Sequence, residues 1–321
     1  MDALAGLLDG PRARGAFLLR SVLDPPWSLR IADEAPLTLV AVVSGGASIW
    51  FDGEQPTRLA CGDVAIARGP APYTVADDPA TAPQALILPG QECVTPDGSP
   101  LQDLAVQGVR TWGNATDGET VLLTGTYQLD GEVGGRLLRA LPPLVVLRDE
   151  ECRSPLVPLL AEEIVKDAPG QEAVLDRLLD LLLIAMLREW LARPEAEAPP
   201  WYRAYGDPIV GPALRLLHND PAQPWTVASL ADTVGVSRAT LARRFAEQVG
   251  EPPMAFLTDW RITLAADLLR EPGATIGSVA QQVGYASPFA LSAAFKRVRG
   301  ISPREHRELA ESATAAASAA S

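Results

Sequence analysis

Side chains that can hydrogen-bond to nucleic acid are concentrated in two segments of the last third of this 321-residue chain. The first segment runs from Ser237 to Arg244, and the second runs from Ser287 to Arg297. An arginine can donate two parallel hydrogen bonds to guanine O6 and N7, and lysine, serine and arginine also bind phosphate oxygens. This chemistry predicts contacts with double-stranded DNA, provided that each segment forms a helix exposed on one side.

Residues suited to catalysis are scarce. The chain has two histidines, His218 and His306, so residues 1–217 contain no Ser-His-Asp or Cys-His triad. It also lacks the glycine-rich phosphate-binding motifs. Its three cysteines have no metal-ligand spacing: Cys61, Cys93 and Cys152. The sequence therefore predicts a protein that is not an enzyme and that has neither a metal site nor another cofactor.

The two segments overlap an internal repeat whose copies span residues 225–245 and 275–295, and the second segment extends two residues beyond its copy, to Arg297. Each copy has a threonine that can cap a helix, a small alanine where two helices cross, a glycine for the turn and a serine that caps a second helix. These residues are Thr226, Ala231, Gly235 and Ser237 in the first copy and Thr275, Ala280, Gly284 and Ser287 in the second. The pattern is typical of a helix-turn-helix and predicts two of them, joined by a long helix over residues 254–270.

This region, residues 208–308, resembles the AraC/XylS family of bacterial transcription regulators. The residues that carry the resemblance are Trp225-Thr226-Val227, Leu230-Ala231, Gly235 to Arg238, Phe245, Gly250 to Pro253, Trp260-Arg261, Ala265-Ala266, Leu268-Leu269, Val283 to Tyr285, Phe295-Lys296 and Ile301 to Pro303. The resemblance implies that the second helix of each copy enters one of two successive major-groove segments on one face of the DNA.

The resemblance also implies roles for individual residues. Arg243 stands at the family's base-contacting position, and Ala239 and Ala242 beside it offer apolar contact, for example to a thymine methyl group. Arg238, Thr240 and Arg244 are candidate phosphate or groove-edge contacts. In the second copy, Ser292 is a candidate base or phosphate contact, and Lys296 and Arg297 are expected near the DNA backbone. The capping serines Ser237 and Ser287 complete the candidate DNA-binding residues.

The second copy departs from the family pattern. Ala293 stands where the family usually has arginine, and Pro288 and Phe289 replace more polar residues. We therefore expect the first copy to supply sequence specificity and the second mainly to position the protein.

Residues 15–130 alternate short apolar runs with Gly, Pro and Asp turns, which predicts a small β-barrel or sandwich, with a longer loop over residues 89–119. The region resembles the cupin-type sensor domain through Pro25-Pro26-Trp27, Gly62-Asp63-Val64 and the turn at 68–73. Tyr73 replaces the histidine of metal cupins, so no metal is expected there. The candidate effector-pocket residues, for which core packing is the alternative, are Trp27, Trp50 and Tyr73, and the candidate redox residues are Cys93 and Cys152.

Residues 151–193 predict a helical hairpin whose second helix has two apolar stripes. One stripe contains Val174 and Leu182, and the other contains Leu179 and Met186. The second stripe packs either on the sibling helix or on another copy of the chain, in which case the protein is a homodimer.

The expected architecture is α+β and multidomain. It comprises a cupin-like domain (1–150), the hairpin (151–193), a linker (194–208), an all-α double helix-turn-helix (209–308) and a disordered tail (309–321). Residues 1–200 carry 15 basic and 29 acidic residues, whereas residues 201–310 carry 12 and 10. The net charge of −13 thus comes from the first part, and the expected DNA-binding part is mildly basic.

The chain lacks an export signal and an apolar span, so a cytoplasmic protein with no membrane partner is expected. The sequence predicts a DNA-binding transcription regulator controlled by a small-molecule or redox signal, with RNA polymerase as a further candidate partner. The alternative is an effector-binding cupin protein whose helical part mediates protein contacts only.

Overall fold

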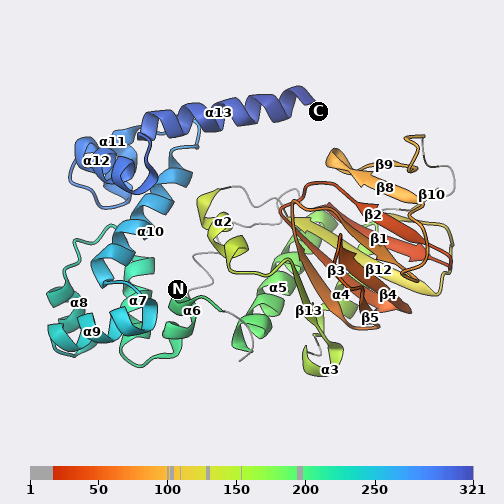
Figure 1. Ribbon diagram of the computed structural model, residues 1–321, viewed down its shortest axis with the longest axis horizontal. Helices are drawn as coiled ribbons and strands as arrows, with labels where there is room; N and C mark the ends of the chain where they lie inside the picture. The colour runs from red at the N-terminus through yellow and green to blue at the C-terminus, as the bar shows by residue number, and fades with distance from the viewer. Residues whose placement is uncertain are drawn as a thin grey trace. The chain divides into compact units, whose positions relative to one another are not determined.

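The computed structural model divides into two compact units, which we call the sheet unit and the helical unit (Figure 1). Of the described residues, the sheet unit contains 17–127 and 138–193, and the helical unit contains 131–137 and 198–320. The described residues are 17–99, 101, 105–108, 110–127, 131–152, 154–193 and 198–320.

The sheet unit consists of two β-sheets. The seven-stranded sheet has the order β10 (Ala105–Gly108), β11 (Thr111–Gly113), β1 (Phe17–Leu23), β12 (Thr120–Tyr127), β3 (Leu37–Ser44), β6 (Val64–Arg68) and β13 (Leu144–Leu147). The six-stranded sheet has the order β5 (Thr57–Ala60), β4 (Gly46–Phe51), β7 (Tyr73–Ala76), β2 (Ser28–Ile31), β8 (Ala85–Leu88) and β9 (Glu92–Val94). The prediction of a strand-rich first part is therefore confirmed.

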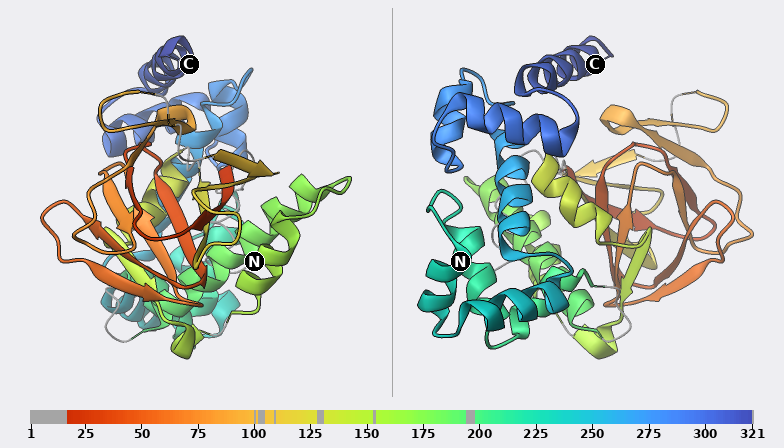
Figure 2. Two further views of the ribbon diagram at one scale, coloured as in Figure 1. Left: turned by 90° about the vertical axis from the view of Figure 1, so that its right-hand side faces the viewer. Right: turned by 60° about the vertical axis from the view of Figure 1, so that its left-hand side comes forward.

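The two sheets share one hydrophobic core. Leu29 and Ile49 enter it from the six-stranded sheet, and Val42 and Leu122 enter it from the seven-stranded sheet. Figure 2 shows the strands curving around this interior. Side chains alternate along a strand, so the residues directly before and after each of these four point to the outer faces of the sheets.

The segment 89–119, which the sequence predicts to be a loop, contains regular structure instead. It forms the short 3₁₀ helix η1 (Pro89–Gln91) and the strands β9, β10 and β11. Strand β11 runs parallel to β1, with Arg20 opposite Thr111. That pairing joins segments about 90 residues apart, so the local sequence pattern does not reveal it.

Helices α3 (Asp149–Cys152), α4 (Leu156–Ile164) and α5 (Gln171–Ala192) complete the sheet unit. A side chain at Gly125 would lie 2.7 Å from Leu179, so this glycine allows α5 to approach β12 closely. The Tyr127 hydroxyl donates a hydrogen bond to the Leu179 carbonyl at 2.8 Å. Leu182 of one α5 stripe and Met186 of the other are also buried. Most of each stripe therefore packs within its own chain.

The helical unit is built around α10 (Pro253–Leu268), which runs between two helix groups in Figure 1. Its remaining elements are α2 (Glu132–Arg139, of which residues 132–137 belong to this unit), α6 (Pro200–Arg203), η2 (Ala204–Gly206), α7 (Val210–Asn219), α8 (Val227–Val234), α9 (Arg238–Val249), α11 (Ile276–Gln282), α12 (Pro288–Arg299) and α13 (Pro303–Ala320). Phe256 packs with α7, α8 and α9 in one core, and Ile262 packs with α11 and α12 in another.

Helix α2 is the main departure from the expected domain layout. It lies between β12 and β13 in the chain, yet its first six residues pack in the helical unit. Asp267 of α10 accepts hydrogen bonds from the backbone N–H groups of Glu132 and Val133, at 2.6 and 3.0 Å. Ion pairs join Arg136 to Asp259 and Glu132 to Arg299, at 3.0 and 2.8 Å.

Two other segments differ from expectation. Residues 200–206 of the predicted linker form α6 and η2, whose aromatic side chains Trp201 and Tyr205 pack on the helical core. Part of the linker, residues 194–197, lies outside the described residues. The segment from 309 to 320, predicted to be disordered, continues α13 because alanine has the highest helix propensity.

Candidate nucleic-acid interface

The first helix-turn-helix, α8 and α9, has the predicted caps. The Thr226 hydroxyl accepts a hydrogen bond from the Ser229 N–H at 3.0 Å, and the Ser229 hydroxyl accepts one from the Thr226 N–H at 2.9 Å. Gly235 takes a φ of +82° in the turn, and the Ser237 hydroxyl accepts from the Thr240 N–H at 3.1 Å. These local bonds fix the angle at which α9 leaves the turn.

The second helix-turn-helix, α11 and α12, repeats this arrangement. The Thr275 hydroxyl accepts from the Ser278 N–H at 3.1 Å, and the Ser287 hydroxyl accepts from the Ala290 N–H at 3.2 Å. Gly284 has a φ of +79°, and a side chain there would lie 2.6 Å from the Ala222 carbonyl oxygen. The predicted cap residues of both copies are thus confirmed.

The exposed face of α9 carries the candidate base contacts. Arg238, Ala239 and Arg243 are exposed, and Ala242 is half-buried beside them. The Arg243 side chain is 67 % exposed and forms an ion pair one turn along the helix with Glu247, at 2.9 Å. Such exposed pairs contribute only about 0.3–0.5 kcal/mol, so Arg243 can leave Glu247 for a stronger partner.

Arg244 has a different environment from Arg243. It lies 2.8 Å from the carboxylate of Asp207, whose side chain is only 9 % exposed. The same carboxylate accepts backbone hydrogen bonds from Ile209 and Val210 at the start of α7. Burial alone would raise the pKa of Asp207, but the hydrogen bonds from Arg244 and these N–H groups lower it. Arg244 therefore joins α9 to α7.

The exposed face of α12 is less polar than that of α9. The Ser292 hydroxyl donates to the Pro288 carbonyl at 2.8 Å within its own helix. Lys296 and Arg297 are exposed. Phe289, in the first turn, is 86 % exposed, and this exposure was not part of the sequence expectation.

The three candidate effector residues of the sheet unit do not meet in one pocket. Trp27 is buried in the core. Tyr73 faces an interior cavity of about 50 Å³ that Trp112 and Cys93 also line. Trp50 lies on the outer face of the six-stranded sheet, because the alternating register places it opposite Thr74 and not Tyr73.

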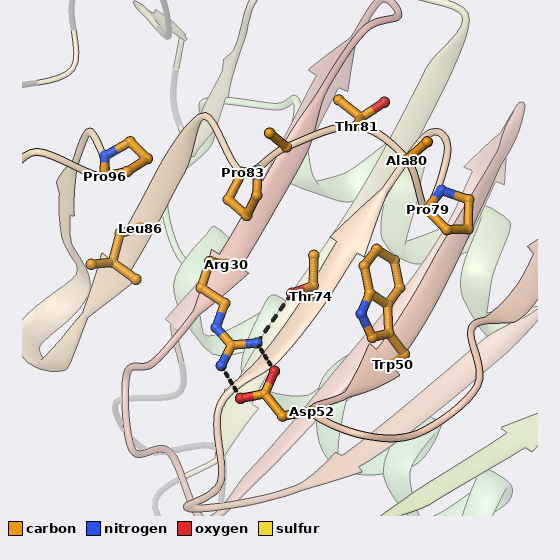
Figure 3. Close-up of a pocket in the computed structure, with 11 residues that line it drawn as sticks. Arg30, Trp50, Asp52, Thr74, Pro79, Ala80, Thr81, Pro83, Leu86 and Pro96 are labelled. Carbon is orange, nitrogen blue, oxygen red and sulfur yellow. Dashed lines mark hydrogen bonds and ion pairs between the residues drawn. The ribbon is translucent and has the colours of Figure 1, made fainter.

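Trp50 lines an outer cavity of about 480 Å³ under the loop 79–83 (Figure 3). Arg30 lines this cavity and forms a bidentate ion pair with Asp52, with N–O distances of 2.7 and 2.5 Å. Arg30 also donates to the Thr74 hydroxyl at 3.2 Å. Three successive strands of the sheet, β4, β7 and β2, thus bring together an aromatic wall and a charged pair. The sequence pattern does not reveal this combination, because it depends on the pairing of strands distant in the chain.

The candidate redox cysteines are poorly suited to thiolate chemistry. Burial raises the pKa of the Cys93 thiol. Burial and the negative charge of Glu189 raise the pKa of the Cys152 thiol. Both groups are therefore protonated near neutral pH, whereas redox-sensing cysteines are typically exposed and have a low pKa.

Among the described residues, no group of three or more His, Cys, Asp or Glu side chains is arranged to hold a metal ion. No helix in the described part of the chain has the length and apolar character needed to cross a bilayer.

Comparisons with known proteins agree with both units. A cupin family model matches residues 2–192, and a helix-turn-helix domain model matches residues 230–309. An AraC-like transcription regulator of Streptomyces lividans is 34 % identical over 313 residues, covering 96 % of this chain and 98 % of that protein.

Two further relatives extend the comparison. The transcriptional regulator AlkR of Acinetobacter baylyi is 29 % identical and covers 96 % of this chain and 99 % of that protein. The solved DNA-binding domain of AdpA in complex with a target DNA is 32 % identical and covers 32 % of this chain and 93 % of that one, with a TM-score of 0.30. The chain belongs to the AraC-like transcription regulators and combines a cupin domain with a helix-turn-helix domain.

Proposed function

We propose that the chain places α9 and α12 in successive major-groove segments of double-stranded DNA, with α9 reading base edges through Arg243. The observation that carries this proposal is the exposure of Arg243 in the middle of a doubly capped recognition helix, with a weak surface pair as its alternative. Lys296 and Arg297 of α12 then bind phosphates and set the register. The relatives favour this function over a helical part that mediates protein contacts only.

The test is a binding measurement with sites selected from random duplex DNA. Arg243→Ala should weaken binding to the selected site by about 1–3 kcal/mol and relax the preference for guanine at one position. Arg215→Ala, which removes an exposed arginine of α7, is the matched control. Unchanged affinity and sequence preference in the Arg243 variant would remove it from the interface.

We further propose that a second copy of the chain covers the exposed apolar residues of α5. These residues are Val174 and Leu181, both more than two-fifths exposed. Val174 and Leu181 lie seven residues apart on α5, a spacing that places them on one side of the helix and suits pairing with the same helix of another copy.

Light scattering on the full-length protein tests this proposal. Leu181→Glu should convert a dimer into monomers and lower the occupancy of paired DNA sites. Ala173→Glu, at an exposed position of α5 about 100° around the helix from Val174, is the control for the added charge. A dimer that persists in the Leu181 variant would contradict the proposal.

The volumes of the two cavities favour the outer one as the effector site. A cavity of about 480 Å³ lies within the usual range for small organic ligands, whereas one of about 50 Å³ holds only a few atoms. A planar molecule that stacks on Trp50 and hydrogen-bonds to the Arg30–Asp52 pair would match its lining.

A panel of aromatic amides and acids, screened by calorimetry, would test this assignment. Compounds that bind the wild type should fail to bind Trp50→Ala and should still bind Tyr73→Phe, which changes only the interior cavity. The opposite result would place the effector inside the sheet unit.

A further inference from the structure

Phe289 is the most exposed large apolar side chain in the described part of the chain. It is the second residue of α12, directly after the Ser287 cap and Pro288. A side chain this exposed contributes little to the hydrophobic core of its own unit. A single exposed apolar residue does not by itself imply a partner, so the position of Phe289 within the repeat is decisive.

The repeat indicates what Phe289 contacts. Phe289 lies 50 residues after Ala239, and Ala293 lies 50 residues after Arg243. The first recognition helix therefore has a small residue followed by an arginine, whereas the second has a large apolar residue followed by a small one. The long side chain of the second helix thus lies one helical turn nearer the N-terminal end than the long side chain of the first. Recognition helices contact bases at this end.

The neighbours of Phe289 offer few hydrogen bonds. Ala290 and Ala293 are exposed and apolar, and the Ser292 hydroxyl already donates to the Pro288 carbonyl. The nearest cations on α12 are Lys296 and Arg297, two turns further on, where they suit phosphates. This face is thus unsuited to reading base edges by hydrogen bonds but suited to an apolar group in the groove.

The apolar group that the major groove presents is the C5 methyl of thymine. We propose that Phe289, flanked by Ala290 and Ala293, reads a thymine methyl in the major-groove segment that α12 occupies. This inference rests on the proposed DNA-binding function and gives the second helix-turn-helix a sequence preference in addition to its positioning role.

The test uses sites selected from random duplex DNA with the full-length wild-type protein. Deoxyuridine then replaces each thymine in turn, which removes the methyl group and leaves every hydrogen-bonding group in place. At one position in the α12 segment, this replacement should weaken wild-type binding roughly fourfold, the effect expected for losing one buried methyl. The same replacement should leave the affinity of Phe289→Ala unchanged.

Two controls make the result specific. Val298→Ala removes an exposed apolar side chain from the opposite face of α12 and should keep the wild-type sensitivity to deoxyuridine. A cytosine–guanine pair at the same position should bind weakly, and 5-methylcytosine there should restore part of the lost affinity. Circular dichroism of Phe289→Ala should match the wild type, since the side chain packs against little of its own unit.

Each outcome separates this inference from the function on which it rests. If Phe289→Ala retains the wild-type response to deoxyuridine at every position, or loses affinity equally for all sequences, the methyl readout is wrong while DNA binding stands. If the wild-type protein selects no sequence at all, the proposed DNA-binding function fails as well.

Discussion

The carboxylate of Asp267 on α10 caps the start of α2, where its Oδ1 accepts the backbone N–H of Glu132 at 2.6 Å. These residues lie 135 positions apart in the sequence. Burial raises the pKa of Asp267, and the two N–H donors of α2 oppose that shift. Helix α2 lies between strands β12 and β13 in the sequence, yet its first residues are held by this cap from α10 of the helical unit.

Removing this cap should release α2. Asp267→Ala is expected to cost about 0.5–2 kcal/mol, the usual cost of losing a helix cap, and to speed hydrogen exchange at the amides of residues 133–137. Asp259→Ala, which removes the partly exposed partner of Arg136, should have a smaller effect. Exchange rates that match the wild type in the Asp267 variant would contradict the docking.

Replacing the two adjacent arginines of α9, Arg243 and Arg244, should affect the stability of the protein unequally. Arg244→Ala should lower the free energy of unfolding by about 1–2 kcal/mol, because the mostly buried Asp207 carboxylate loses a charged hydrogen-bond donor. Arg243→Ala should change stability by less than about 0.5 kcal/mol, because its pair with Glu247 is exposed. Urea unfolding and DNA titration of both variants check this, and equal losses of stability would overturn the distinction.

The helical unit should lose stability as the pH falls below about 6.5. His218 is enclosed by Trp201, Phe256 and Trp260, and burial lowers its pKa to about 4. The unfolded chain, with an ordinary histidine pKa of 6.5, binds the proton more readily, so stability is complete above pH 6.5 and falls by about 3 kcal/mol toward pH 4.

The pH dependence of unfolding in His218→Phe provides the check. This variant keeps an aromatic ring but cannot take up a proton, so its stability should be nearly flat between pH 6.5 and 4.5, even if its absolute value is lower because the bond to Tyr205 is lost. A slope equal to that of the wild type would assign the titration to other groups.

The turn glycines of the two helix-turn-helix copies should tolerate alanine unequally. Both have a positive φ, which costs an alanine about 1–2 kcal/mol. Gly235 has open space where a side chain would extend, whereas at Gly284 the side chain would collide with the backbone of Ala222. Gly284→Ala should therefore lower the melting temperature more than Gly235→Ala, and equal shifts would contradict this packing.

The sequence predicts local features well and distant ones poorly. The caps at Thr226 and Ser287 depend on residues three positions away, so a short pattern reveals them. Strand β13 pairs with β6, about 80 residues earlier, and α2 contains Gly134 and Gly135 and is held by Asp267. No local pattern indicates these contacts, and both elements were missed.

The candidate site residues show the same contrast between local patterns and long-range contacts. Exposure of Arg243 follows from its place on an amphipathic helix, but the engagement of Arg244 depends on Asp207, 37 residues away. Trp50 and Tyr73 were grouped because both are aromatic residues of the predicted barrel. The register of β4 and β7 places them on opposite faces of one sheet, and that register depends on long-range pairing.

In the proposed binding mode, the unequal helices α9 and α12 give the DNA site of a single chain a direction. Helix α9 presents alanine and arginine at the positions where α12 presents phenylalanine and alanine. A DNA segment that matches both helices therefore differs from its own reverse complement. Inverting such a segment upstream of a gene would exchange which helix lies nearer the start of transcription, so orientation becomes a regulatory variable in addition to sequence.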